Sequence, residues 1–251
     1  MEWRDTGFVL SARRHGESAL IVELLTCEHG RHSGLVRGGQ SPRRRAVLQP
    51  GNGVAASWRG RLPQHLGTLD CELMEAHAAR VLDDPDRLAA LGAATALLLT
   101  MLPEREPHGD LYVSLAGLLD ALDSGLLWAQ SYVTWECDLL RGLGFGLDLA
   151  RCAATGAKDD LLYVSPRSGR AVSRAAGMPY HDKLLPLPGF LWREAPVSRP
   201  ASRNEIVAGL ALTQYFLLHH VLAPHGGKLP EARERLAERM RRSATTGIID
   251  A

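Results

Sequence analysis

The pattern of apolar residues changes near residue 80, and this change limits what the chain can fold into. Before it, short apolar runs alternate with turns rich in glycine and charge, which is typical of β-strands. The expected strands cover residues 7–12, 19–25, 34–36, 53–58 and 66–73. Five short strands in about 75 residues predict a small β-barrel. The segment 38–51 contains Gly-Gly, Ser-Pro and Pro-Gly dipeptides, so we expect a surface loop there.

Beyond residue 83 the apolar segments are longer and predict helices. These cover 83–102, 109–123, 127–143 and 203–222, and a last helix follows Pro230. Ser202 and Glu205 have the spacing of a capping box, which marks the start of the fourth helix. The most apolar run, 88–102, is shorter than the ~20 residues that cross a bilayer, so it predicts a buried helix rather than a membrane span. Residues 147–190 are irregular, with a strand-like stretch at 161–165.

The formal net charge of +1 hides a strong separation of charge along the chain. Residues 1–80 carry 11 Arg and 8 acids, residues 81–150 carry 3 Arg and 11 acids, and residues 151–251 carry a net charge of +6. Between Glu28 and Asp70 lie 41 residues with no carboxylate and seven arginines. Because a solvated surface normally mixes both signs, this acid-free stretch indicates a cationic surface on the barrel.

Several classes of protein and site are disfavoured by the sequence. The four cysteines lie at 27, 71, 137 and 152, far from the spacing of a zinc knuckle, and we expect reduced thiols. The first five residues include three charges where a signal peptide needs apolar residues, so no export is expected. The sequence has no GxSxG elbow, no HExxH motif and no clustered acid pair of a two-metal nuclease, and nothing in it requires an enzyme.

The basic stretch has the composition of a groove for single-stranded nucleic acid. In such grooves phosphates supply salt-sensitive affinity and aromatic rings stack on bases. Trp58, between strand residues and Arg59 and Arg61, is either a stacking platform or a residue of the barrel core. For the run Arg43, Arg44 and Arg45 the alternatives are phosphate contact and a merely solubilising loop.

Short motifs occur in both halves of the chain. In the first half these are GFVL at 7–10, RHGES at 14–18, TCEHGR at 26–31, VRGG at 36–39 and LQPG at 48–51. In the second half they are WECDLL at 135–140, LGFGLDL at 143–149, CAATG at 152–156, SPRSGRAVS at 165–173 and LPLP at 185–188. No single motif is decisive, but as an ordered set over nearly the whole chain they resemble the RecO family of DNA repair and recombination proteins.

The resemblance implies an α+β multidomain fold. Residues 1–80 would form a five-stranded OB-fold barrel that binds nucleic acid, and residues 81–251 an all-α helical domain with a degenerate zinc-module-like insertion at about 147–190. Zinc-bearing members place two Cys-x-x-Cys pairs in that module. Here Cys152 remains, while Thr155, Ser173 and Ala176 occupy the other three positions and cannot replace thiolates, so we expect no zinc and no other cofactor.

The resemblance also implies a function, which is that of a recombination mediator rather than an enzyme. Such a protein binds single- and double-stranded DNA, anneals complementary strands and, with RecR, helps to load RecA onto single-stranded DNA coated by the single-strand-binding protein. It works in the bacterial cytoplasm, at the nucleoid. Its partners would be RecR, the acidic tail of the single-strand-binding protein (SSB) and, indirectly, RecA. A rival from another class is a protein-interaction adaptor whose barrel does not bind DNA.

We expect phosphates to be held by arginines of the barrel, largely without base readout. Shielding phosphate charge would let two complementary strands approach, with no bond made or broken. The candidate residues are Arg13, Arg14, Arg31, Arg37, Arg43, Arg44, Arg45, Arg59 and Arg61.

Overall fold

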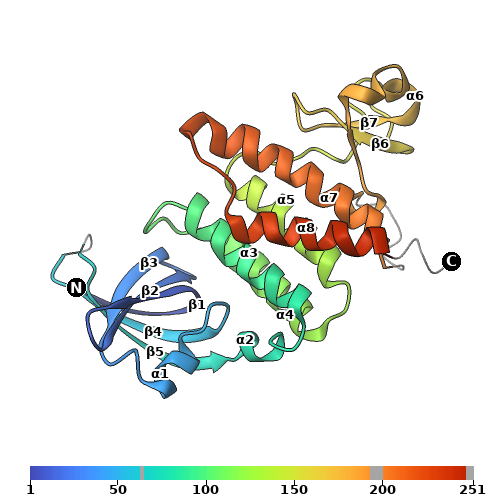
Figure 1. Ribbon diagram of the computed structural model, residues 1–251. Coiled ribbons are helices and arrows are strands. Elements are labelled where there is room, and N and C mark those ends of the chain that lie inside the picture. Colours follow the sequence, from blue (N-terminus) through green and yellow to red (C-terminus); the bar gives the residue numbers. More distant parts are fainter. Residues whose placement is uncertain (63–64, 193–199, 247–251) are drawn as a thin grey trace. The chain divides into compact units, whose positions relative to one another are not determined.

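The computed structural model (Figure 1) describes residues 1–62, 65–192 and 200–246. It divides into two compact units, one formed by residues 1–125 with 230–233 and the other by residues 126–229 with 234–251. The domain boundary expected near residue 80 stays a prediction. The predicted boundary marks the change from strands to helices. The compact units instead divide after Gly125, because the first helices that follow the barrel pack with the barrel.

The first unit begins with a closed barrel of five strands, in the order β1-β2-β3-β5-β4. The predicted five-stranded barrel is therefore confirmed. The strands are β1 (Glu2–His15), β2 (Ala19–Thr26), β3 (Gly30–Val36), β4 (Gly53–Arg59) and β5 (Thr68–Glu75). All neighbouring pairs are antiparallel except β3 and β5, which are parallel.

Strand β1 is long because it pairs with two strands, β4 along its first half and β2 along its second half. Its first half pairs with β4, from Glu2 opposite Arg59 to Phe8 opposite Gly53. Its second half pairs with β2, and the register shifts between Val9 and Ser11. Such an irregularity bends a strand, which is what closure of a small barrel requires.

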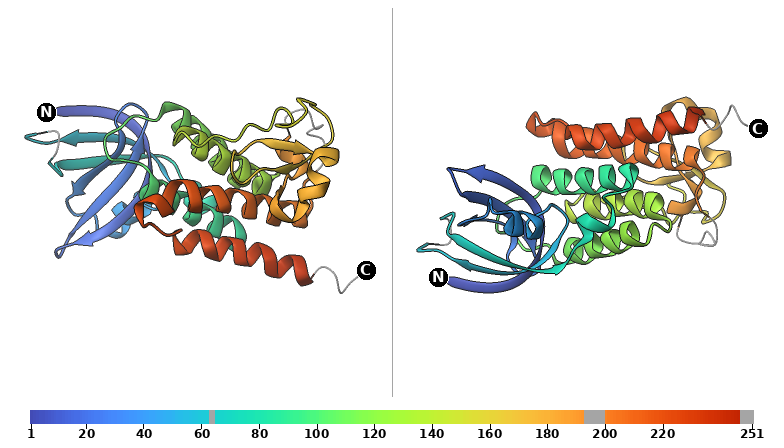
Figure 2. Two further views of the ribbon diagram at one scale, coloured as in Figure 1. Left: turned by 90° about the horizontal axis from the view of Figure 1, so that it is seen from above. Right: turned by 60° about the horizontal axis from the view of Figure 1, so that its bottom comes forward.

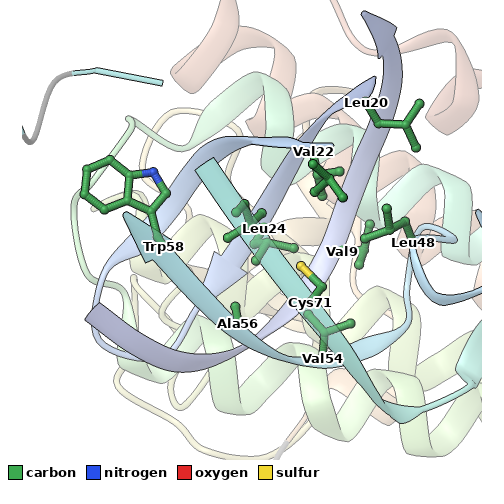
Figure 3. Close-up of a cluster of buried hydrophobic side chains, with 11 residues drawn as sticks. Val9, Leu20, Val22, Leu24, Leu48, Val54, Ala56, Trp58 and Cys71 are labelled. Atoms are coloured by element: carbon green, nitrogen blue, oxygen red, sulfur yellow. The ribbon is translucent and has the colours of Figure 1, made fainter. Parts of the chain in front are cut away.

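The barrel interior is filled by apolar side chains from alternating strand positions (Figure 3). Leu20, Val22 and Leu24 of β2 all point inward and are at most 5% exposed. Trp58 lies at one edge of this cluster in the figure. The predicted surface loop holds one short helix, α1 (Pro42–Val47), none of whose residues is buried, and Leu48 after it enters the core.

Two helices complete the first unit after the short α2 (His77–Arg80). Helix α3 (Pro85–Met101) starts at Asp84, whose carboxylate accepts hydrogen bonds from the amides of Asp86 and Arg87. Most of its apolar residues are buried, as predicted, although Leu88 is exposed. Helix α4 (Gly109–Ser124) lies beside it, and Arg87 donates to the Leu122 carbonyl at its end.

Helix α3 lies at one end of the barrel, and the amino-terminus lies at the other (Figure 2). Leu91 of α3 contacts the barrel near Gly51, and the segment after α3 runs along the start of β3. At that point Gly30 has a φ of +65°, and a Cβ there would lie 2.0 Å from the Glu106 carbonyl oxygen. Only glycine allows this approach.

The second unit joins helices α5 (Trp128–Gly142), α7 (Arg203–Phe216) and most of α8 (Glu231–Thr246). The chain continues from α7 into a π-helical turn, Leu217–Leu222. The predicted capping box is present, since Ser202 and Glu205 each bond the other's backbone amide. The Thr213 hydroxyl donates to the buried Glu136 carboxylate, which ties α7 to α5.

The predicted irregular region also contains a small sheet of order β7-β6-β8. Its strands are β6 (Leu161–Val164), β7 (Ala171–Ser173) and β8 (Leu185–Pro186), and the short helix α6 (Arg174–Gly177) follows β7. Among the described residues, the helix from Arg203 to Leu222 is long and apolar enough to cross a membrane by length and composition alone. One such helix is weak evidence for a membrane span, because the core helix of a soluble protein passes the same test.

Candidate nucleic-acid interface

Arg31 differs from the other predicted arginines because it lies inside the protein. Its side chain is 15% exposed, and its guanidinium contacts Glu23 at 2.5 Å and donates to the Leu102 carbonyl at 2.9 Å. Glu23 is itself buried. These contacts join the barrel to the end of α3, so the geometry gives Arg31 a structural role and does not favour a phosphate contact.

Three further arginines of the predicted set are paired with carboxylates at the surface. Arg13 contacts Glu23 at 3.2 Å, Arg44 contacts Asp70 at 2.5 Å and Arg59 contacts Glu2 at 3.0 Å. Their side chains are 69%, 40% and 74% exposed. Exposed pairs of this kind are weak, so a phosphate can compete for each cation.

The remaining five have no carboxylate partner among the residues that the structure describes. They are Arg14, Arg37, Arg43, Arg45 and Arg61, and all are exposed. Arg14 and Arg45 line one concavity of about 240 Å³, together with Gln40 and Leu48. Gln40 donates to the carbonyls of Gly16 and Ala19, so it fixes the loop after β3 against the β1–β2 turn. We call these five side chains the cationic loop set.

Trp58 belongs to the barrel core. It is 1% exposed, its indole nitrogen donates to the Leu66 carbonyl, and it packs against Gly60 and Gly67. A Cβ would lie 2.4 Å from the indole ring at Gly60 and 2.5 Å from it at Gly67, so only glycine fits at either position. Of the two alternatives left open by the sequence, the structure therefore supports the core residue rather than an exposed platform.

Sequence reasoning missed an aromatic cavity of about 320 Å³ at the barrel, lined by Trp3, Glu28, His29, His32, Trp58 and Arg105. We call it the aromatic cavity. Trp3 pairs directly with Trp58 across β1 and β4. That cross-strand register could have revealed it, but register depends on where β1 bends, which the sequence pattern does not show.

The rings of the aromatic cavity form an ordered stack. Trp3 lies parallel to His29, with ring centroids 4.3 Å apart, and nearly parallel to Trp58 at 6.0 Å. His32 meets both indoles edge-on at 5.0 Å. Burial, followed by the nearby charge of Arg105, lowers the pKa of His32 to about 4, so it is neutral at pH 7.

The region expected to be a degenerate zinc module does not offer a zinc site. Cys152 is buried, and its sulfur accepts a hydrogen bond from the Ser173 amide at 3.3 Å. Burial opposes ionisation of this thiol, but hydrogen bonds from Ser173 and Thr155 outweigh it and lower the pKa to about 6. The hydroxyls of Thr155 and Ser173 and the methyl group of Ala176 cannot stand in for three thiolates, so the donor set does not fit tetrahedral zinc. Across 1–62, 65–192 and 200–246, no three His, Cys, Asp or Glu side chains form a group that could hold a metal.

The second unit has its own cavity of about 400 Å³, lined by residues that include Cys137, Asp138, Arg141, Asp148 and Phe190. Arg141 is paired with Asp138 at 2.5 Å. Asp148 is likewise paired with Arg170 at 3.4 Å, so the described rim has no excess of base for an acidic tail.

These features define a class, which is a two-unit protein with a small closed barrel, cationic loops and a helical second part. The family model described as "Recombination protein O N terminal" matches residues 1–77, and "Recombination protein O C terminal" matches residues 82–229. The chain belongs to the RecO family.

Curated relatives agree over almost their whole length. "DNA repair protein RecO" of Rhodospirillum rubrum is 55% identical over 96% of this chain and 97% of its own length. Its counterpart in Rhodospirillum centenum is 54% identical over 99% and 98%. The protein of that name in Methylocella silvestris is 48% identical over 98% of this chain and all of its own length.

Proposed function

We propose that this protein is a recombination mediator in DNA repair and that its barrel is an OB-fold that binds single- and double-stranded DNA. Its family and the name of its relatives, DNA repair protein RecO, support the repair role. The observation that carries DNA binding is the cationic loop set, five exposed arginines without a carboxylate partner among the described residues. The family acts as a mediator, and we assign no catalytic residue.

The physical basis of annealing is charge neutralisation. Each arginine that binds a phosphate releases a condensed counterion and lowers the repulsion between two strands. These side chains lie on the short helix α1, in turns and near strand ends, and contacts from them to phosphates carry no sequence information. Complementary strands held this way pair by their own base complementarity, with no bond made or broken.

Binding of a fluorescent single-stranded oligonucleotide over a series of salt concentrations tests the assignment. The double variant Arg43→Ala/Arg45→Ala is expected to weaken binding and to reduce the slope of log affinity against log salt by up to about 1.4, which is about 0.7 per lost phosphate contact. Adding Arg44→Ala to the double variant is expected to reduce the slope by less than the loss of Arg43 or of Arg45 does, because Arg44 already contacts Asp70.

The matched control is Arg141→Ala, which removes an exposed, ion-paired arginine from the second unit. Its slope is expected to equal that of the unchanged protein. If the double variant also leaves affinity and slope unchanged, the cationic loop set is not the DNA interface. If the unchanged protein binds no oligonucleotide at low salt, the rival reading as an interaction adaptor is correct.

The family also suggests partners, which we propose as RecR, the acidic SSB tail and, indirectly, RecA on SSB-coated single strands. The second unit, with a degenerate zinc-module-like insertion, is the region proposed for protein contacts. Its cavity has no excess of base at the described rim for an acidic tail, so we assign the tail no site there. The proposed place of action is the bacterial cytoplasm, at the nucleoid.

A further inference from the structure

The aromatic cavity is the feature of the barrel that phosphate binding leaves unexplained. Its ring stack, His29 on Trp3 and Trp3 facing Trp58, presents flat parallel faces at one place on the barrel. His29 is held in this orientation, because its Nδ1 lies 3.0 Å from a carboxylate oxygen of Asp5. The same carboxylate accepts the Glu28 amide, so the wall of the cavity is fixed before any ligand arrives.

His32 gives the cavity a polar wall without partners. The residue is 5% exposed, and neither of its ring nitrogens has a hydrogen-bond partner among the described residues. A buried donor or acceptor left unpaired is costly for a folded protein. A neutral imidazole has one donor and one acceptor nitrogen that point in different directions, so one of them can meet the polar edge of a nucleobase.

Charges of both signs line the cavity and nearly balance. Glu2 and Glu28 lie in its wall together with Arg105. Arg59 neutralises Glu2 by contact at 3.0 Å. A flat, uncharged and partly polar group fits these walls better than either an anion or a purely aliphatic one.

The cavity also lies next to cations that can hold the backbone of the same strand. Gly60 and Met1, a lining residue, exchange backbone hydrogen bonds at 2.8 and 3.0 Å. Gly60 is flanked in the sequence by Arg59 and by Arg61, a member of the cationic loop set. A strand whose phosphates contact this segment would have its bases within reach of Trp3.

We propose that the aromatic cavity binds one unstacked nucleobase of single-stranded DNA. The base stacks against the parallel rings and turns its polar edge toward His32. This rests on the proposed function, because it deepens the DNA binding assigned to the cationic loop set. It adds one feature that phosphate contact lacks, which is a preference for single strands over a duplex whose bases are already stacked.

The test compares two probes of equal length and equal charge. One is an oligothymidylate, and the other is the same chain of sugar phosphates without bases. Affinity and tryptophan fluorescence of the full-length protein are followed over a salt series. The oligothymidylate is expected to bind about 10-fold more tightly and to quench the fluorescence, as stacking on aromatic residues does in single-strand binders.

Two variants locate this difference at the cavity. Trp3→Leu keeps an apolar side chain but removes the stacking face, and His32→Phe keeps a ring in the same place but removes both nitrogens. Each is expected to bring the two probes close to equal affinity without changing the salt slope. Tyr180→Ala, which removes an exposed aromatic ring from the second unit, is the matched control and is expected to keep the preference.

The outcomes separate this inference from the proposed function. Equal binding of both probes by the unchanged protein, with a salt slope that still depends on Arg43 and Arg45, overturns the base site and leaves DNA binding intact. A base preference that survives in both variants also overturns it. Quenching by a phenylalanine-containing peptide and not by the oligothymidylate would assign the cavity to a protein partner. Failure of both probes to bind removes the proposed function as well.

Discussion

The two ends of the barrel use arginine in opposite ways. At the end beside α3, Arg31 is mostly buried and contacts Glu23 and the Leu102 carbonyl. Just past the other end of the same strand, Arg37 is exposed and has no carboxylate partner among the described residues. The two residues lie six positions apart in one acid-free stretch. The comparison teaches that an arginine's role is set by what packs against its strand end, here a helix at one end and solvent at the other.

The substitution with the largest expected effect lies at the barrel end beside α3, which we call the packed end. Gly30→Ala is expected to destabilise the protein by more than about 4 kcal/mol, because a Cβ would lie 2.0 Å from the Glu106 carbonyl oxygen and the backbone is left-handed there. Since the clashing atom belongs to the backbone, no side chain can move away to relieve it. Thermal or denaturant unfolding of the variant measures the loss.

Gly38→Ala is the matched control for that substitution. Gly38 has nearly the same φ, +62°, but a Cβ there would meet nothing within 4 Å. It is expected to cost only the conformational penalty of about 1–2 kcal/mol. Equal destabilisation by the two variants would show that α3 and the segment after it do not pack on the start of β3 as described.

The next effect separates the buried arginine from the exposed one. Arg31→Ala is expected to cost about 2–4 kcal/mol, since it leaves Glu23 buried with only the exposed Arg13 as a partner. Arg37→Ala is expected to change stability by less than about 0.5 kcal/mol. The effects on DNA binding have the opposite order: Arg37→Ala is expected to reduce the salt slope of binding, and Arg31→Ala is expected to leave that slope unchanged.

Paired unfolding curves and salt titrations of these two variants check the reversal. A lower salt slope in folded Arg31→Ala, or a large loss of stability in Arg37→Ala, would contradict the division of the barrel into a packed end and a cationic end.

The comparison also shows which parts of the structure were accessible from the sequence. Short apolar runs between turns and the capping box of Ser202 and Glu205 are local signals, so the five strands and the start of α7 were predicted. The identity of the packed arginine was not, because Arg31 meets Leu102 across a separation of 71 residues. The aromatic cavity depends in the same way on the pairing of Trp3 with Trp58.

The smallest effect concerns His32, which the cavity leaves unpaired. Its pKa is lowered from 6.5 to about 4 by burial and by the charges of Arg105 and His29, against the opposing charge of Glu104. The unfolded chain therefore binds a proton between about pH 6.5 and 4 that the folded chain does not, so stability falls as the pH drops through this window.

We expect His32→Phe to remove about 1–2 kcal/mol of that loss at pH 5. At pH 7 the variant should be at least as stable as the unchanged protein, because no buried nitrogen is left without a partner. Unfolding at both pH values, with His15→Phe at an exposed strand end as the control, measures the difference. If the two proteins lose stability in parallel between pH 7 and 5, His32 is not the buried neutral group that distinguishes this cavity from the cationic end of the barrel.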